Sequence, residues 1–262
     1  MKNSENTHLL PLIIITPFFG DCEENLFRLK NQLIADFNLN DKWIIVYDNS
    51  EPKNFTENEN EQIIILKNNS IPGAGNTRNI ALDFIQKNLN YNYLLYPLDS
   101  DDEVLPSSIY KIKRAFEDYQ ERVITFGHIK SWTKKNINIG YEGIFNLRSL
   151  LMNYITPCGS TIIKINSRDD LDNLRFGHRK RANDQLFFLN AVKKFKCFRS
   201  IREPILLYKI TDDNSVSSKK YKMIFYKYLA FRDFGISRFM SIYYMFYYAY
   251  HGFMRHILKI GV

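Results

Sequence analysis

Short apolar runs alternate with longer amphipathic stretches through the first half of the chain. The runs predict buried strands at five places, Leu12–Thr16, Trp43–Tyr47, Ile63–Leu66, Tyr93–Leu98 and Val123–Ile129. Between them, apolar residues at helical spacing predict three helices, over about 23–37, 75–89 and 106–119. Strands alternating with such helices are typical of a mostly parallel sheet with helices on both faces. The run at 63–66 shows no polar alternation, so we expect it to be buried on both faces.

The second half is less regular. It predicts a strand at 161–165, a helix at 183–195 and a strand at 205–210, and from Lys219 onward it reads as helices dense in Tyr and Phe. We therefore expect one α/β domain over 1–217, made of two halves at about 9–130 and 131–217. A helical extension, 218–262, would follow it.

Composition narrows the class of protein. The 262 residues are 45% hydrophobic and 24% charged, which excludes a disordered chain and a polytopic membrane protein. The three cysteines are far apart, so neither a disulfide framework nor a cysteine-rich zinc site is expected, and a cytoplasmic location follows. The apolar segment Leu9–Phe19 is interrupted by prolines and lacks a cleavage site, which argues against a signal peptide.

The formal net charge of +8 hides an asymmetry. Residues 1–130 contain 13 Lys and Arg against 19 Asp and Glu, whereas residues 131–262 contain 23 against 9. A uniformly basic nucleic-acid binder would not show this division, so no nucleic-acid partner is expected. The division favours an acidic half that holds a cation and a basic half that meets an anionic ligand or lipid.

Carboxylates follow two of the predicted strands. Asp48 ends the second strand, and Asp99, Asp101 and Asp102 follow the fourth. In an open parallel sheet, ligands bind beyond the carboxyl ends of the strands. Three carboxylates within four residues repel one another unless a cation or hydrogen bonds compensate them, and oxygen ligands suit Mg²⁺ or Mn²⁺. A single Asp at a strand end, such as Asp48, is equally consistent with an ordinary turn.

Two further segments could carry chemistry. The glycines of 73–79 precede a helix and would let backbone N–H groups approach an anion, although an ordinary capping loop with Arg78 on a solvated face explains the pattern equally well. Asp184 opens the helix at 183–195 after the basic loop Arg175–Arg181. It could act as a general base beside an anion clamp, or simply cap the helix.

Taken together, these residues resemble the family 2 glycosyltransferases of the GT-A fold over about 11–216. The most specific match is Leu98-Asp99-Ser100-Asp101-Asp102 followed by Pro106, which is similar to the family's Asp-x-Asp motif. Gly73–Asn79 is similar to its glycine-rich segment, with Thr77 in place of Ala. Asn183-Asp184 stands where the family usually has Glu-Asp. Ser215-Val216-Ser217 matches a tail motif, whose upstream basic residue only Lys209 loosely matches.

The resemblance implies roles for particular residues. The catalytic base would be Asp184, and the metal, Mn²⁺ or Mg²⁺, would be held by Asp101 with Asp99. Asn183 would contact the sugar or the acceptor. Gly159 could admit either of them close to the backbone, although an ordinary turn explains this glycine at least as well. The donor nucleotide sugar would bind in the 9–130 half, at Thr16, Pro17, Asp48, Gly75, Arg78, Asp99 and Ser100.

The implied activity is a metal-dependent, inverting transfer of a sugar from a nucleotide-diphosphate sugar, expected to be a UDP-sugar, to a glycan or lipid-linked acceptor in surface-polysaccharide synthesis. One alternative is a sugar nucleotidyltransferase, although the segment after the first strand lacks the glycine- and lysine-rich loop such an enzyme needs. The other is a non-enzymatic module that binds membrane or nucleic acid, which leaves the Asp cluster unexplained.

The last forty residues have a distinct pattern. Sixteen uncharged residues, 239–254, are rich in Tyr and Phe and follow six Lys and Arg opposed only by Asp233. The run is shorter than the roughly 20 residues that span a bilayer. An interfacial helix on the inner face of the cell membrane fits this pattern. The alternatives are a helical lid packed on the catalytic domain or the interface of a homodimer.

Overall fold

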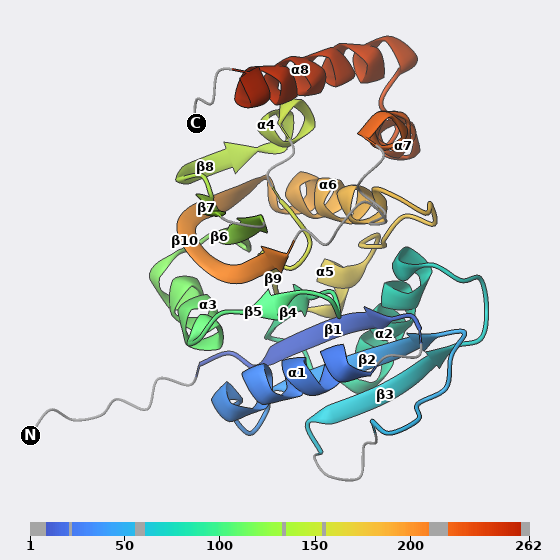
Figure 1. Cartoon of the computed structure of the whole chain (residues 1–262), viewed down its shortest axis with the longest axis vertical. Coiled ribbons are helices and arrows are strands. Elements are labelled where there is room, and N and C mark those ends of the chain that lie inside the picture. The colour runs from blue at the N-terminus through green and yellow to red at the C-terminus, as the bar shows by residue number, and fades with distance from the viewer. Residues whose placement is uncertain are drawn as a thin grey trace, which may run out of the picture.

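The computed structural model describes residues 9–20, 23–55, 61–132, 135–153, 156–209 and 220–257. These residues form a mixed α/β fold around one central sheet with helices on both sides (Figure 1). The strands are β1 Leu12–Phe18, β2 Lys42–Asp48, β3 Ile63–Asn68, β4 Tyr93–Pro97, β5 Glu103–Val104, β6 Val123–Trp132, β7 Lys135–Ile139, β8 Gly143–Asn146, β9 Thr161–Ile165 and β10 Cys197–Lys209. The helices are α1 Glu24–Leu33, α2 Ala74–Asn88, α3 Ser108–Asp118, α4 Leu147–Met152, α5 Arg168–Leu171, α6 Asn183–Phe195, α7 Lys220–Asp233 and α8 Arg238–Ile257, with a 3-10 turn, Ile34–Asp36, after α1.

The first half of the sheet is parallel, as expected. The order along the main path is β3-β2-β1-β4-β9-β6-β10-β5, and β3, β2, β1 and β4 all run in the same direction. Leu12 and Ile14 join the core on the side of α1 and α3, whereas Ile13 and Ile15 join the core on the side of α2 and α6. Continuous apolar strands are required because both faces of the sheet are covered.

The expectation for 63–66 is confirmed only in part. This run forms β3, which pairs only with β2 among the described strands and lies at the edge of the sheet. Ile64 and Leu66 pack against one core cluster, and Ile63 and Ile65 against the other, so both faces are covered. Ile63 is buried, but Ile64, Ile65 and Leu66 are only half-buried, because an edge strand has a neighbouring strand on one side alone.

The second half of the sheet is mixed. β9 pairs antiparallel with both β4 and β6, and β10 pairs parallel with β6 but antiparallel with β5 and β8. β10 begins at Cys197, eight residues before the predicted strand, and its register with β6 shifts at Pro204. That proline and the surrounding charged residues hid the first part of β10, and the short elements β7, β8 and α4 were also not predicted.

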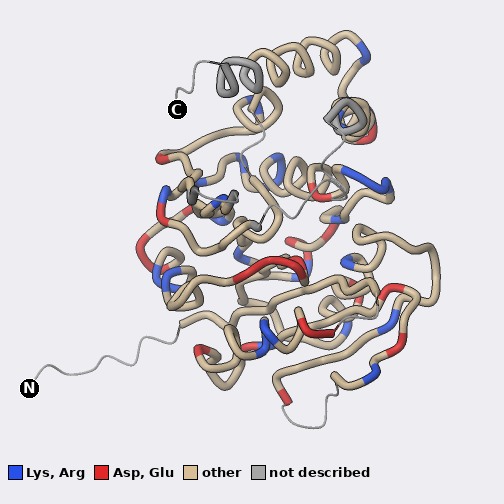
Figure 2. The backbone as a smooth tube through the Cα atoms, viewed as in Figure 1, with Lys and Arg blue, Asp and Glu red and all other residues tan. Residues whose placement is uncertain are grey.

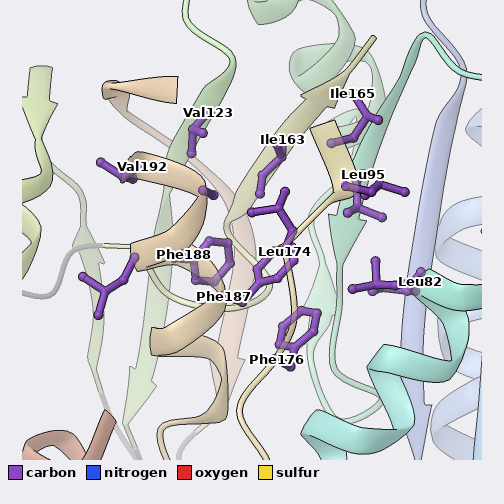
Figure 3. Close-up of a cluster of buried hydrophobic side chains, with 14 of the residues drawn as sticks. Leu82, Leu95, Val123, Ile163, Ile165, Leu174, Phe176, Phe187, Phe188 and Val192 are labelled. Carbon is purple, nitrogen blue, oxygen red and sulfur yellow. The ribbon is translucent and has the colours of Figure 1, made fainter. Parts of the chain in front are cut away.

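Aromatic packing fixes α6 against the sheet. Figure 3 shows Phe187 and Phe188 of α6 directed toward Ile163 of β9, with Phe176 beside them. The rings of Phe176 and Phe187 are stacked, with centroids 4.1 Å apart and planes only 5° from parallel. Since α6 begins at Asn183, this packing sets the position of the helix end that carries Asp184.

The two C-terminal helices pack on the α/β domain. α7 contacts α6, and α8 contacts α7 and α4 at the end of the molecule farthest from β3 (Figure 1). Phe231 and Met245 are buried in the same core cluster as Phe187. The expected boundary near Ser217 lies outside the described residues. Within the described part of the chain, no helix combines the length and apolarity needed to cross a membrane.

Candidate active site

The turn after β4 carries the acidic residues that the sequence analysis singled out, and Figure 2 shows them as a red stretch in the middle of the molecule. Asp99 and Ser100 are half-buried, Asp101 is exposed and Asp102 is buried. Arg28 of α1 donates to the backbone carbonyls of Asp101 and Asp102, at 3.3 and 3.1 Å. The turn is therefore held in place through its backbone.

The carboxylates of this turn disfavour one another's ionisation. Burial raises the pKa of Asp102 well above its usual value, and the charges of Asp99 and Asp101 raise it further. Desolvation and the charge of Asp99 also raise the pKa of Asp101. Such crowding is the condition under which a bound cation stabilises a group of carboxylates most strongly.

Arg78 connects this turn to the second half of the chain. Its side chain is buried, forms a salt bridge with Asp99 and donates to Oδ1 of Asn183 at 2.9 Å. The guanidinium lies over the ring of Phe176, 5.1 Å from its centroid. Burial alone would lower the pKa of Arg78, but Asp99 and Asp184 raise it above its usual value. The solvated position considered for Arg78 is therefore wrong.

The glycine-rich segment at the start of α2 is a docking surface for the loop 175–183. A Cβ on Gly75 would lie 2.0 Å from the carbonyl oxygen of Gly177, so only glycine allows this approach. Asn79 donates to the carbonyl of Phe176 at 3.1 Å and accepts from its N–H at 2.9 Å. These contacts explain the segment by packing, while the predicted donor contact of Gly75 stays a prediction.

Asp184 lies in the first turn of α6. Its Oδ1 accepts from the backbone N–H of Gln185 at 3.0 Å, and its side chain is half-buried. Ala182, before the helix, has a positive φ of 53° and offers no side-chain cap. Because Asn183 is bound to Arg78, which is paired with Asp99, Asp184 is brought to the same part of the molecule as the acidic turn.

The segment 156–160 forms another wall of the site. The N–H of Gly159 donates to the carbonyl of Pro97 at 2.9 Å, and the hydroxyl of Tyr96 donates to the carbonyl of Gly159 at 2.8 Å. A Cβ on Gly159 would lie 2.4 Å from Oδ2 of Asp102, so this glycine, at a φ of +80°, is fitted against the acidic turn. Its predicted contact with sugar or acceptor stays a prediction.

Sequence reasoning missed Cys158 as a residue of the site. Burial raises the pKa of its thiol well above the usual value, with Asp99 and Asp184 adding to the effect and Arg78 opposing it. The thiol therefore lies within the electrostatic reach of both the acidic turn and the predicted base. Its place before Gly159 was the only signal, because a lone cysteine has no characteristic spacing.

The remaining predicted donor residues make contacts within the protein. Thr16 is fully buried and its Oγ1 accepts from Nε1 of Trp43 at 2.9 Å, while Pro17 continues β1 beside it. Asp48 accepts from Nδ2 of Asn68 at 2.9 Å and from the N–H of Gly73 at 2.8 Å. Asp48 thus fixes the entrance to α2, and its role with a nucleotide stays a prediction.

Two arginines of the basic loop are bound to protein carboxylates. Arg175 donates to Asp83 at 3.0 Å, and Arg179 donates to both oxygens of Asp233, at 2.6 and 2.8 Å. These bonds attach the loop to α2 and α7. Arg181 differs, because its Nη1 is buried with no hydrogen-bond partner. The anion clamp envisaged for this loop is thus reduced to Lys180 and Arg181.

The acidic turn fits a divalent cation by its chemistry. In the described ranges, no three Asp, Glu, His or Cys side chains converge closely enough to hold a metal by themselves. A Mg²⁺-type ion, however, needs only one or two carboxylates when substrate phosphates and water complete its shell. Asp101 and Asp99 supply that number, beside the buried carboxyl group of Asp102.

Comparisons with known proteins agree with this arrangement. A family model described as glycosyl transferase family 2 matches residues 13–175. A protein of Escherichia coli named UDP-Glc:alpha-D-GlcNAc-diphosphoundecaprenol beta-1,3-glucosyltransferase WfaP is 24% identical over 252 residues, 93% of this chain and 94% of its own length.

Solved structures show the same fold. TarS 1–349 of S. aureus in complex with UDP-GlcNAc superposes with a TM-score of 0.65 at 15% identity, covering 90% of this chain and 70% of that one. Its complex with UDP gives 0.62 over the same shares. The residues that match the family model, 13–175, include the elements from β1 to α5 and the acidic turn after β4. The chain is therefore a glycosyltransferase that belongs to glycosyl transferase family 2, with the GT-A fold.

Proposed function

We propose that this glycosyltransferase moves a sugar, with inversion at the anomeric carbon, from a UDP-sugar to a lipid-linked glycan acceptor in a metal-dependent reaction. The observation that supports this most directly is the bridge made by Arg78. It joins Asp99, on the metal-binding side, to Asn183, next to the predicted base. This bridge supports a single site in which the proposed metal ligands lie near the proposed base.

The donor assignment is supported by the similar proteins. The name of the E. coli relative specifies UDP-Glc as donor and a diphosphoundecaprenol-linked sugar as acceptor, and the TarS structures contain UDP-GlcNAc or UDP. Mn²⁺ or Mg²⁺ held by Asp101 with Asp99 would neutralise the diphosphate as it leaves. In this chain, the rigid backbone of the acidic turn and the fixed start of α2 would hold the donor in line.

Asp184 would remove the proton from the acceptor hydroxyl as its oxygen attacks. The half-buried position of Asp184 in the first turn of α6 would leave its carboxylate accessible to an acceptor. Attack from the side opposite the leaving diphosphate inverts the anomeric centre. An acceptor of this kind would be met at the cytoplasmic face of the membrane during surface-polysaccharide synthesis.

The test is a transfer assay with the full chain. UDP-Glc, UDP-GlcNAc and UDP-Gal are each incubated with Mn²⁺ and a synthetic acceptor that carries GlcNAc on a diphospholipid. We expect one donor to give a product whose new linkage is of opposite anomeric configuration to the donor, as read by NMR. Retention of configuration would contradict the mechanism. In a separate incubation with UTP and a sugar phosphate, formation of a UDP-sugar would instead identify a nucleotidyltransferase.

A further inference from the structure

The helices α7 and α8 present an unusually apolar surface. Half of the large apolar side chains that are exposed in the described residues lie on these two helices. On α8, the exposed residues include Phe239, Ile242, Phe246 and Tyr250, which are spaced three or four apart and so form one stripe along the helix. Phe239 and Phe246 are 88% and 76% exposed.

The opposite face of α8 packs on the protein. Ser241 and Met245 are buried, and Tyr244 and Tyr248 pack against the core cluster. The outward stripe is therefore not a consequence of a loosely attached helix. Both faces of α8 are therefore apolar: one packs on the protein, and the other is exposed in the described part of the structure.

An open groove lies beside the stripe. It has a volume of about 430 Å³ and runs between α7 and α8, with Ile224, Phe225, Ile242 and Phe246 among its lining residues. The lining of such a groove suits an aliphatic chain, since it offers contact area and few hydrogen-bonding groups.

The charges of α7 and α8 indicate which kind of partner binds this apolar surface. Residues 220–257 contain six Lys and Arg, of which Lys227 is buried against the ring of Tyr248, and a single acid, Asp233, which is already bound by Arg179. Residues 239–254 of α8 contain no Lys, Arg, Asp or Glu, and Figure 2 shows the part of this helix that is drawn in colour as tan after its basic first residue. Two copies of this surface facing each other would bring basic helices together, which disfavours a dimer. Anionic lipid headgroups would instead attract them, and Tyr-rich helices prefer the headgroup boundary.

We propose that the α8 stripe and the α7–α8 groove form a docking surface for an anionic phospholipid bilayer, with an acyl chain entering the groove. This proposal rests on the proposed function in one respect, because a lipid-linked acceptor lies in a membrane. The binding of this surface to a bilayer does not itself require sugar transfer. α7 lies between α8 and α6, whose first turn carries Asp184, so docking would bring the acceptor side of the enzyme toward the membrane.

The test is flotation of the full chain with vesicles of phosphatidylcholine alone or with added phosphatidylglycerol. We expect binding to the anionic vesicles at low salt. The double variant Phe239→Ser/Phe246→Ser should lower the bound fraction about tenfold or more, because each buried Phe contributes strongly to transfer from water. Point variants are preferable to truncation before α7, which would expose the core at Phe231 and Met245.

The matched control is Leu39→Ser/Tyr110→Ser, which changes two exposed apolar residues elsewhere, 88% and 61% exposed, and should float like the parent. Hydrolysis of the UDP-sugar should be equal in all three proteins, so that a defect in chemistry is distinguished from a defect in docking. The proposal is overturned if the parent stays unbound on anionic vesicles or if the Phe pair floats unchanged. It is also overturned if the Phe pair merely converts a dimer to a monomer in light scattering.

Discussion

Buried acids occur in two regions of this molecule, and their partners differ. Near the start of the sheet, Asp41 accepts from the Lys113 ammonium at 2.8 and 2.6 Å and from the N–H of Leu12 at 2.7 Å. Glu23 accepts from the hydroxyl of Tyr47 at 2.6 Å and from three successive backbone N–H groups, 53–55. Each of these carboxylates ties a helix or loop to the sheet.

The acids after β4 lie beside one another instead. Asp102 is buried beside Asp99 and Asp101, and its pKa is raised, whereas hydrogen bonds lower the pKa of Glu23 despite its burial. A well-bonded acid contributes to folding, but a crowded acid reduces stability and persists where a ligand needs it. The comparison therefore predicts that the first acids hold the fold and that the acids after β4 serve the proposed reaction, and variants can test that prediction.

The largest effect is expected at the acidic turn. Asp101→Ala should abolish transfer, because it removes the exposed carboxylate best placed to hold a cation, while the melting temperature should change little. Excess EDTA should likewise abolish transfer by the parent enzyme, and Mn²⁺ should restore it. Product formation measured by mass spectrometry checks both effects. Full activity in EDTA would exclude the metal role.

Asp184→Asn should lower kcat by about 10²–10⁴-fold, the usual contribution of a general base. The affinity for UDP, measured by calorimetry in the presence of Mn²⁺, should stay near that of the parent, because the carboxylate acts on the acceptor. A variant that lost UDP affinity but kept its turnover would show that Asp184 belongs to the donor site.

Arg78→Met and Lys113→Met are compared because each removes a buried cation that pairs with an acid. Lys113→Met should lower the free energy of unfolding in urea by about 3–5 kcal/mol, because its partner Asp41 is fully buried. Arg78→Met should lower it by less, because its partner Asp99 is only half-buried. Only Arg78→Met should also lower kcat/KM, by about 10²-fold, since it frees Asp99 and Asn183. If the two variants lost activity equally, the two regions would not differ in their contribution to the reaction.

Glu23→Gln should give the smallest effect, a loss of about 1–3 kcal/mol in unfolding free energy at neutral pH. Because the pKa of Glu23 is below its usual 4.5 in the fold, its stabilisation is present above that value and disappears as the pH falls through the lowered pKa. The parent and the variant should therefore converge in acid. Thermal melts across the acidic pH range measure this. A difference in stability between parent and variant that grew as the pH fell would contradict the stabilising role of the Glu23 carboxylate.

The sequence allowed the alternating half of the fold and the acidic turn to be predicted, because strand runs, helix spacing and a crowded Asp cluster are all local patterns. The partners of Arg78 could not be predicted, since Asn183 is 105 residues away and neither residue has a pattern that identifies the other. The need for Gly75 was also hidden, because it depends on the backbone of Gly177. β8 and the start of β10 were missed since their apolar residues are few and interrupted.

The contact between α2 and the loop 175–183 also determines when the site can form. Its hydrogen bonds join residues 89 to 105 positions apart, so this part of the chain has a high contact order. Closing such a long loop costs conformational entropy before any of these bonds can form. During synthesis from the N-terminus, α2 is complete while its partner loop has not yet been made. We therefore expect the candidate site to be completed late in folding, after the β1–β4 part of the sheet has formed.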